Sequence, residues 1–226
     1  MSTKDELKII FGMVGSITSS IIYLSPIIPF YKILKDELKY KKYPGLVLFL
    51  SLMNCFLWTD YGLLISDKYI YISNTIGGIF LLVWITIYLF FLSKKNFKLS
   101  GGFNVFLLIS ITFIMSLFYF MVPEEGTGIA ATFFNLLLYV MPVKNILKVI
   151  DKTNIKYIPI FSAILGLVNS SCWIIYAICS NEYNKYYKIL IAQGVGFVLG
   201  IFQIIIYIMY YFKYKDKRKK RALSEI

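Results

Sequence analysis

Histidine is absent from this 226-residue sequence, and acidic residues are few, with 12 aspartates and glutamates against 24 lysines and arginines. Without histidine, the chain lacks the side chain that most often relays protons or binds metal ions near neutral pH. Cys55, Cys172 and Cys179 lie inside apolar runs and have no metal-binding spacing such as Cys-X-X-Cys. We interpret them as small apolar residues, and we expect no metal and no cofactor.

Apolar residues make up 58% of the sequence, and its mean hydropathy is +0.70. A soluble domain of this length has too little interior to bury so much apolar surface, so lipid must be the solvent for much of the chain. The net charge of +12 is confined to short segments between apolar runs. Because no long basic face remains to follow a phosphate backbone, we expect a lipid bilayer as partner and no nucleic acid.

Seven apolar runs have about the 20 residues that a helix needs to cross a bilayer. They lie at approximately 8–30, 45–65, 70–92, 103–122, 128–147, 158–179 and 189–212, and a basic tail follows at 213–226. The first run is long and lacks a small-residue cleavage site, so we expect no cleaved signal peptide. The sequence predicts a multi-pass membrane protein made of one compact helical bundle.

Basic residues are divided unevenly between the two sides of the predicted membrane. Nineteen of the 24 follow the first, third and fifth runs or lie in the C-terminal tail. Lysine and arginine concentrate on the cytoplasmic side of membrane proteins, which is known as the positive-inside rule. This rule predicts a cytoplasmic C-terminus and an extracellular or lumenal N-terminus. Seven spans satisfy this prediction. We expect the plasma membrane in preference to an internal membrane.

An internal repeat relates the first three runs to the last three. The matched pairs are Gly12/Gly128, Tyr23/Tyr139 and Pro26/Pro142, 116 apart; Pro44/Pro159, Leu52/Leu167, Asn54/Asn169, Trp58/Trp173 and Tyr61/Tyr176, 115 apart; and Gly77/Gly196 and Tyr88/Tyr207, 119 apart. Residues 8–92 and 128–212 are therefore predicted to be two three-helix units. The helix at 103–122 returns the chain across the membrane, so both units have the same orientation. The predicted fold is an all-α membrane protein with a 3-1-3 arrangement around a central path.

Polar residues inside the runs fall at repeat-related positions. They form the pairs Asn54 with Asn169, Trp58 with Trp173, and Asn74 with Gln193. Intramembrane polar residues usually face a bundle interior or an aqueous path. Indole faces stack on the C–H faces of a sugar, while amides exchange hydrogen bonds with its hydroxyls without a charge. We favour a sugar pocket over the alternative of interfacial tryptophans and amides that merely join helices.

Four prolines also form repeat-related pairs, at the predicted cytoplasmic ends of the first two spans of each unit. They are Pro26 with Pro142, and Pro44 with Pro159. Proline removes a backbone donor and loosens a helix locally. We interpret the four as hinge points, although a single proline at such a place is usually only a helix boundary.

Several short motifs resemble the SWEET sugar facilitators, also called the MtN3/saliva family. They are Leu24-Ser-Pro26, Leu57-Trp-Thr-Asp-Tyr-Gly62, Asn74-Thr-Ile-Gly77, Cys172-Trp-Ile-Ile-Tyr176 and Gly194-Val-Gly-Phe-Val-Leu-Gly-Ile-Phe-Gln203. The resemblance covers nearly the whole chain. It implies a seven-helix sugar transporter with alternating access, and no enzymatic activity.

The resemblance also implies roles for individual residues. The family's asparagine pair maps to Asn74 and Gln193, its tryptophan pair to Trp58 and Trp173, and its hinge prolines to the four named above. Further pocket positions are Ser19, Ile22, Asn54, Asn135, Leu138 and Asn169. The outer gate would use Tyr61. The aspartate that the family pairs with this tyrosine falls at Tyr186, so the sequence does not indicate how the outer gate closes.

Facilitated uniport is favoured over proton symport on the residues alone, because Asp60 is the one carboxylate well inside a span and the sequence has no histidine. We expect a monosaccharide as the cargo. The alternatives are a related PQ-loop transporter of another small solute, although no Pro-Gln dipeptide occurs, and a seven-span receptor. The sequence leaves open whether copies of the chain assemble into a homo-oligomer.

Overall fold

The computed structural model describes residues 3–35, 45–93 and 97–223, which are almost entirely helical. The first half contains α1 (Thr3–Leu24), α2 (Ile27–Leu34), α3 (Gly45–Leu64) and α4 (Lys68–Leu92). After α5 (Phe97–Met121), the second half contains α6 (Glu124–Leu138), α7 (Val140–Lys152), the 3-10 helix η2 (Ile155–Tyr157), α8 (Ile160–Ile178) and α9 (Tyr183–Leu223). Within these described ranges, seven helical stretches are long and apolar enough to span a membrane, which confirms the seven predicted spans.

Two of the predicted spans are broken helices. The first breaks at Ser25 and Pro26, between α1 and α2, and the fifth breaks at Tyr139, between α6 and α7. Pro26 has no backbone N–H to donate to the Ile22 carbonyl, which instead accepts from the Ser25 N–H at 3.0 Å. The next carbonyl, that of Tyr23, accepts a hydrogen bond from the Trp84 indole at 2.9 Å. The two breaks lie within one turn of equivalent positions in the repeat.

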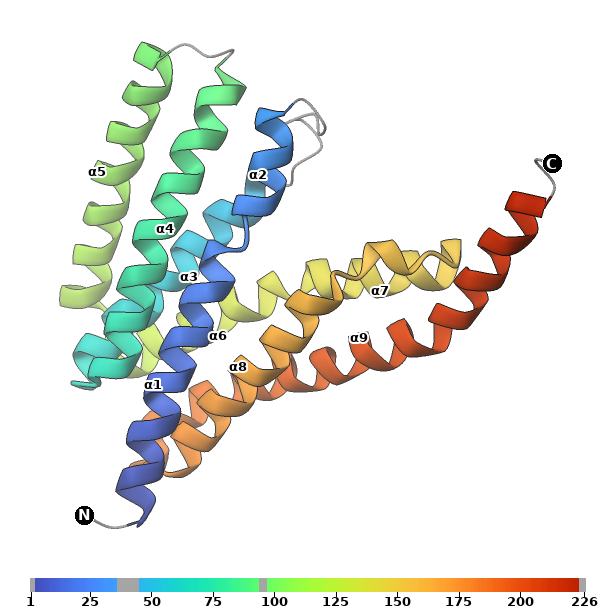
Figure 1. Ribbon diagram of the computed structural model, residues 1–226. Helices are drawn as coiled ribbons and strands as arrows, with labels where there is room; N and C mark the ends of the chain where they lie inside the picture. The colour runs from blue at the N-terminus through green and yellow to red at the C-terminus, as the bar shows by residue number, and fades with distance from the viewer. Residues whose placement is uncertain (1–2, 36–44, 94–96, 224–226) are drawn as a thin grey trace.

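The six helices of the two triplets form a ring. Within the first half, α4 packs between α1 and α3, and within the second half α9 packs between α6 and α8. The halves meet at two places, where α1 packs on α8 and α3 packs on α6. Helix α5 packs outside this ring, against α4 and α3 (Figure 1).

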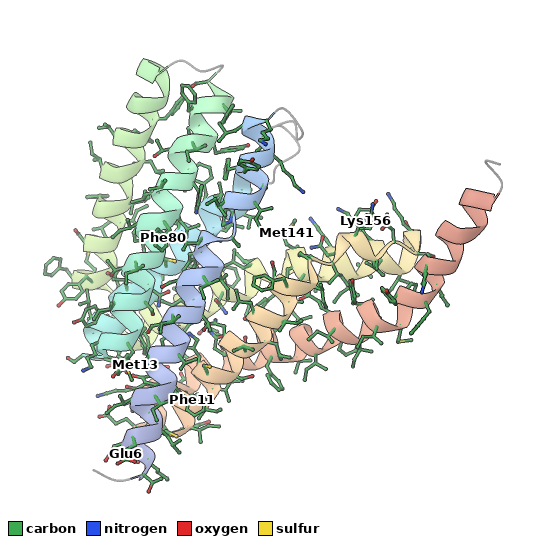
Figure 2. All side chains as sticks on the ribbon, in the orientation of Figure 1. Glu6, Phe11, Met13, Phe80, Met141 and Lys156 are labelled. Carbon is green, nitrogen blue, oxygen red and sulfur yellow. The ribbon has the colours of Figure 1, made fainter. Side chains whose placement is uncertain are left out.

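The two ends of the ring differ. At the end that holds the chain's N-terminus, a buried aromatic cluster that includes Trp58, Tyr61, Trp173 and Tyr176 joins the halves. At the opposite end, which we call the proline end, α2 and α7 lie far apart (Figure 1). Figure 2 shows Glu6 near the first of these ends and Lys156 near the other. The molecule is therefore closed at the N-terminal end and splayed at the proline end.

Candidate functional site

One cavity of about 820 Å³ lies between the two halves. All ten residues predicted to bind substrate line it: Ser19, Ile22, Asn54, Trp58, Asn74, Asn135, Leu138, Asn169, Trp173 and Gln193. They come from α1, α3 and α4 in the first half and from α6, α8 and α9 in the second. The lining also includes exposed residues of the proline end, such as Ile28 and Phe161, so the cavity opens toward that end.

The two tryptophans form the floor of the cavity at its closed end. Trp58 and Trp173 are each 5% exposed, so neither points into lipid. Each ring packs edge-on against the tyrosine three residues later, with centroids 5.7 Å apart for Trp58 and Tyr61 and 5.4 Å apart for Trp173 and Tyr176. This packing restricts both indoles while leaving them in the cavity wall.

A hydrogen-bonded network fixes the wall where α1 meets α8. The Trp173 indole donates to the Ser19 hydroxyl at 3.1 Å, and Ser19 donates to the Asn169 side-chain oxygen at 2.8 Å. Thr18 donates to the same oxygen at 2.9 Å. These bonds link the two halves across the molecule, and they use much of the hydrogen-bonding capacity of Asn169 and Trp173.

The equivalent wall in the other half is less committed. Asn54 is 4% exposed, and its side-chain oxygen is buried without a hydrogen-bond partner among the described residues. The Trp173 indole nitrogen donates to Ser19, whereas the Trp58 indole nitrogen has no such hydrogen bond to another described residue. Asn54 and Trp58 therefore retain capacity for a ligand that their repeat partners have already used.

Two tyrosines that the sequence had marked only as repeat landmarks also line the cavity. Tyr23 donates to the Asn74 side-chain oxygen at 3.5 Å, and Tyr139 accepts from the Asn135 amide at 3.2 Å. An added Cβ at Gly77 or Gly196 would lie 2.4 Å or 2.3 Å from the ring or hydroxyl of these tyrosines. Glycine at both positions lets a tyrosine pack directly on the helix backbone beside the pocket amides.

Three of the four predicted hinge prolines lie at the mouth of the cavity. Pro26 lies at the break between α1 and α2, Pro142 in the first turn of α7, and Pro159 immediately before α8. Pro44 lies outside the described residues. The hinge role of all four stays a prediction.

The closed end contains a carboxylate that the sequence analysis overlooked. Asp67, 6% exposed, caps α4 through its Oδ1 atom, which accepts hydrogen bonds from the backbone N–H groups of Tyr69 and Ile70. Its Oδ2 atom accepts from the hydroxyls of Tyr176 and Tyr186. Asp67 thus ties the first half to α8 and α9 of the second.

Lys8 of α1 completes this cluster. Its ammonium group donates to the Tyr186 hydroxyl at 3.2 Å and to Ser180 at 3.3 Å, and it lies 4.8 Å from the centre of the Tyr186 ring. A signal for Asp67 was available, because it lies 119 residues before Tyr186, at the offset that relates the third spans. Position 186, where the family resemblance implies a gate aspartate, holds a tyrosine in this chain. The carboxylate stands instead at the repeat-related position, Asp67.

Tyr61, the predicted outer-gate residue, lies in the second cross-half contact at the closed end. Its hydroxyl donates to the backbone oxygen of Lys185, and its ring lies under the ammonium group of Lys188. Lys188 is 1% exposed and pairs with Glu125 at 2.8 Å. Tyr61 therefore bridges α3 and α9, although its role in gating stays a prediction.

Asp60, the carboxylate noted inside a span, does not line the cavity. It is buried in α3, and its Oδ2 atom has no hydrogen-bond partner among the described residues. Nothing in the structure places it in contact with a solute.

Comparison with known proteins matches both triplets and leaves out the linker helix. A family model described as a sugar efflux transporter for intercellular exchange matches residues 9–96 and 125–215. The chain is 30% identical to the bidirectional sugar transporter SWEET7b of Oryza sativa subsp. japonica, over 97% of this chain and 84% of that protein. It is 28% identical to SWEET8 of Arabidopsis thaliana, over 98% of this chain and 95% of that protein.

The fold has a counterpart among solved structures. The structure of a eukaryotic SWEET transporter superposes with a TM-score of 0.79 at 22% identity, covering 93% of this chain and 99% of the other. This likeness confirms the predicted all-helical fold. The two matched segments, the seven spans and the shared fold agree: the chain belongs to the SWEET (MtN3/saliva) family.

Proposed function

We propose that this protein carries neutral sugars down their concentration gradient across a membrane, with a monosaccharide as the preferred cargo. One observation carries the proposal: the paired indoles and amides of both halves converge on one cavity that is closed at one end. The relatives named as bidirectional sugar transporters support the same cargo class.

The lining of the cavity favours an uncharged polar solute. No aspartate, glutamate, lysine or arginine is among the described residues that line it. Five amide side chains, several hydroxyls and two indoles supply hydrogen bonds and flat apolar faces instead. An amino acid or an organic anion would leave its charges without partners in such a site, whereas a sugar requires none.

Alternating access follows from the two unequal ends. The state described here is open at the proline end, and release toward the other side requires α1 to part from α8 and α3 from α6 at the closed end. The breaks beside Pro26 and at Tyr139 are where the helices of each half can bend. Because no carboxylate lines the path among the described residues, uniport is the mode that the site supports.

The proposed orientation places the closed end outside the cell and the proline end in the cytoplasm, in the plasma membrane. The basic residues of α7, η2 and the end of α9 support it, since they gather at the proline end. Replacing Lys4 or Lys156 with cysteine tests it: an impermeant maleimide added to intact cells should label the first variant and not the second. Labelling of Lys156→Cys alone would reverse the orientation.

Transport by purified protein in liposomes tests the function. Labelled glucose should equilibrate across the membrane without accumulating, and sucrose should enter more slowly. Trp58→Ala should weaken sugar binding by about tenfold, because a stacking face is lost. Phe113→Ala, on the exposed face of α5, is the matched control and should transport at the parental rate. Parental transport by a normally folded Trp58→Ala variant would overturn the pocket, and accumulation that a protonophore abolishes would overturn uniport.

A further inference from the structure

A second cavity of about 770 Å³ lies on the outside of the second half, between α9 and the junction of α6 with α7. Its lining is aliphatic apart from Tyr139, Gly194 and one charged residue, Lys144. Val143 and Val198, which line it, are exposed, so the groove faces outward. In a membrane-spanning bundle, an outward-facing apolar groove is filled by lipid chains unless protein covers it.

Helix α7 presents three different faces beside this groove. Ile146 and Val149 are buried against α8 and α9, while Leu147 and Ile150 are apolar and exposed. The third face carries exposed lysines four residues apart: Lys144, Lys148 and Lys152. A helix with an exposed apolar face next to a basic face is suited to the boundary between acyl chains and lipid headgroups.

We propose that this groove binds one anionic phospholipid, with an acyl chain between α9 and the α6–α7 junction and its phosphate beside Lys144 and Lys148. The aliphatic lining matches the chain, and the lysines match the negative headgroup. A phospholipid fits this site because the basic surface and the apolar groove adjoin in the order in which the lipid presents its headgroup and its acyl chain. A sugar offers no apolar chain for the groove.

The first half lacks the same combination at equivalent positions. Ile28 stands 116 residues before Lys144 and removes the charge. Thr75 stands 119 residues before Gly194, and Phe80, labelled on α4 in Figure 2, stands in the same relation to Leu199. Because Thr75 and Phe80 are larger than Gly194 and Leu199, the lipid site belongs to the second half, and the first half provides matched controls.

Tyr139 lines both cavities and lies at the break between α6 and α7. A lipid in the groove would therefore contact the point where the second half bends. The headgroup and acyl-chain length of this lipid are therefore expected to change the transport rate, although the lipid does not contact the sugar.

Native mass spectrometry of the full chain tests the site independently of transport. The protein is released from micelles that contain equal amounts of phosphatidylserine and phosphatidylcholine with identical acyl chains. The parental protein should retain one phosphatidylserine molecule in preference to phosphatidylcholine. Replacing Lys144 and Lys148 with glutamine should reduce that preference by about fivefold for each lysine.

Gly194→Leu should reduce retention of both lipids, because the new side chain projects into the groove. An added Cβ at Gly194 has no heavy atom within 4 Å among the described residues, so the variant is expected to fold. The first-half variants Thr75→Leu and Lys32→Gln should retain lipid as the parental protein does. If Gly194→Leu fails to fold, the lysine variants decide the question.

Equal retention of the two lipids by the parental protein would overturn the proposal. So would unchanged preference in the double lysine variant. A parental dimer without bound lipid, which Gly194→Leu converts to a monomer, would show that a second copy of the chain occupies the groove and would also overturn it.

Discussion

Helix α1 meets α8 across the centre of the molecule just as α6 meets α3, and the two contacts are equivalent in the repeat. In each, a glycine of the first helix lies under a tyrosine of the second: Gly12 under Tyr176, and Gly128 under Tyr61. An added Cβ would lie 2.9 Å from the Tyr176 ring in one contact and 2.7 Å from the Tyr61 ring in the other. The backbone geometry of closure is thus the same twice.

The chemistry around the two tyrosines differs. The Tyr176 hydroxyl donates to Asp67, a buried carboxylate that also caps α4. The Tyr61 ring packs instead against the alkyl chain and ammonium group of Lys188, whose repeat counterpart is Tyr69. A repeat can therefore keep its shape while a different charged group is buried at each contact, a carboxylate at one and an ammonium group at the other, and substitutions should reveal unequal contributions.

The largest effect is expected from Asp67→Ala. The substitution removes a helix cap and the acceptor of two buried tyrosine hydroxyls, so the free energy of unfolding should fall by about 3 kcal/mol. Thermal unfolding in detergent measures the change. Glu182→Ala is the matched variant, because Glu182 directly precedes α9 as Asp67 directly precedes α4. It removes only an exposed pair with Lys185 and should change stability little. Equal losses in the two variants would show that Asp67 does not hold the halves together.

A smaller and qualitatively different contrast is expected between the two tryptophans. Trp173→Phe loses the hydrogen bond to Ser19 and should lower the free energy of unfolding by about 1 kcal/mol. Trp58→Phe should leave stability closer to parental and instead raise the sugar concentration needed for half-maximal transport. Unfolding curves and concentration series on both variants measure the two effects. The reverse assignment, with Trp58 the stabilising residue, would contradict the proposed division between a fixed and an available wall.

The smallest effect is expected from Lys188→Met. Glu125 is 59% exposed, so it is readily solvated once its partner is removed, and methionine can occupy the space of the lysine alkyl chain. Stability should change by less than about 1 kcal/mol. Lys188→Tyr, which copies the first half, sharpens the comparison by making both contacts alike. A loss as large as that of Asp67→Ala would mean that the buried ammonium group is the principal link.

The seven spans, the repeat and the residues around the cavity were accessible from the sequence because each leaves a local signal. Apolar length reveals a span, and a constant offset pairs Trp58 with Trp173 although they lie on different helices. The closed end was less accessible. Asp67 lies in a short turn outside the apolar runs, and its partners come from helices about 110 to 120 residues away, so its role depends on packing that no local pattern encodes.

The helix breaks and the outer groove show the same limit. Prolines signalled both helix breaks, but not that the second would fall at Tyr139, three residues before Pro142. The groove depends on the absence of a side chain at Gly194, which becomes informative only when α9 is placed against α6 and α7.

The central claim is that sugar passes through the cavity between the two halves, and a pair of glycine substitutions tests it most directly. Gly166 lines this cavity and Gly102 lies on α5, and an added Cβ meets no described heavy atom within 4 Å at either position. Sugar uptake into liposomes should fall to the background of empty liposomes for Gly166→Leu and remain parental for Gly102→Leu. Parental uptake by a folded Gly166→Leu variant would contradict the account, because the path would then lie elsewhere.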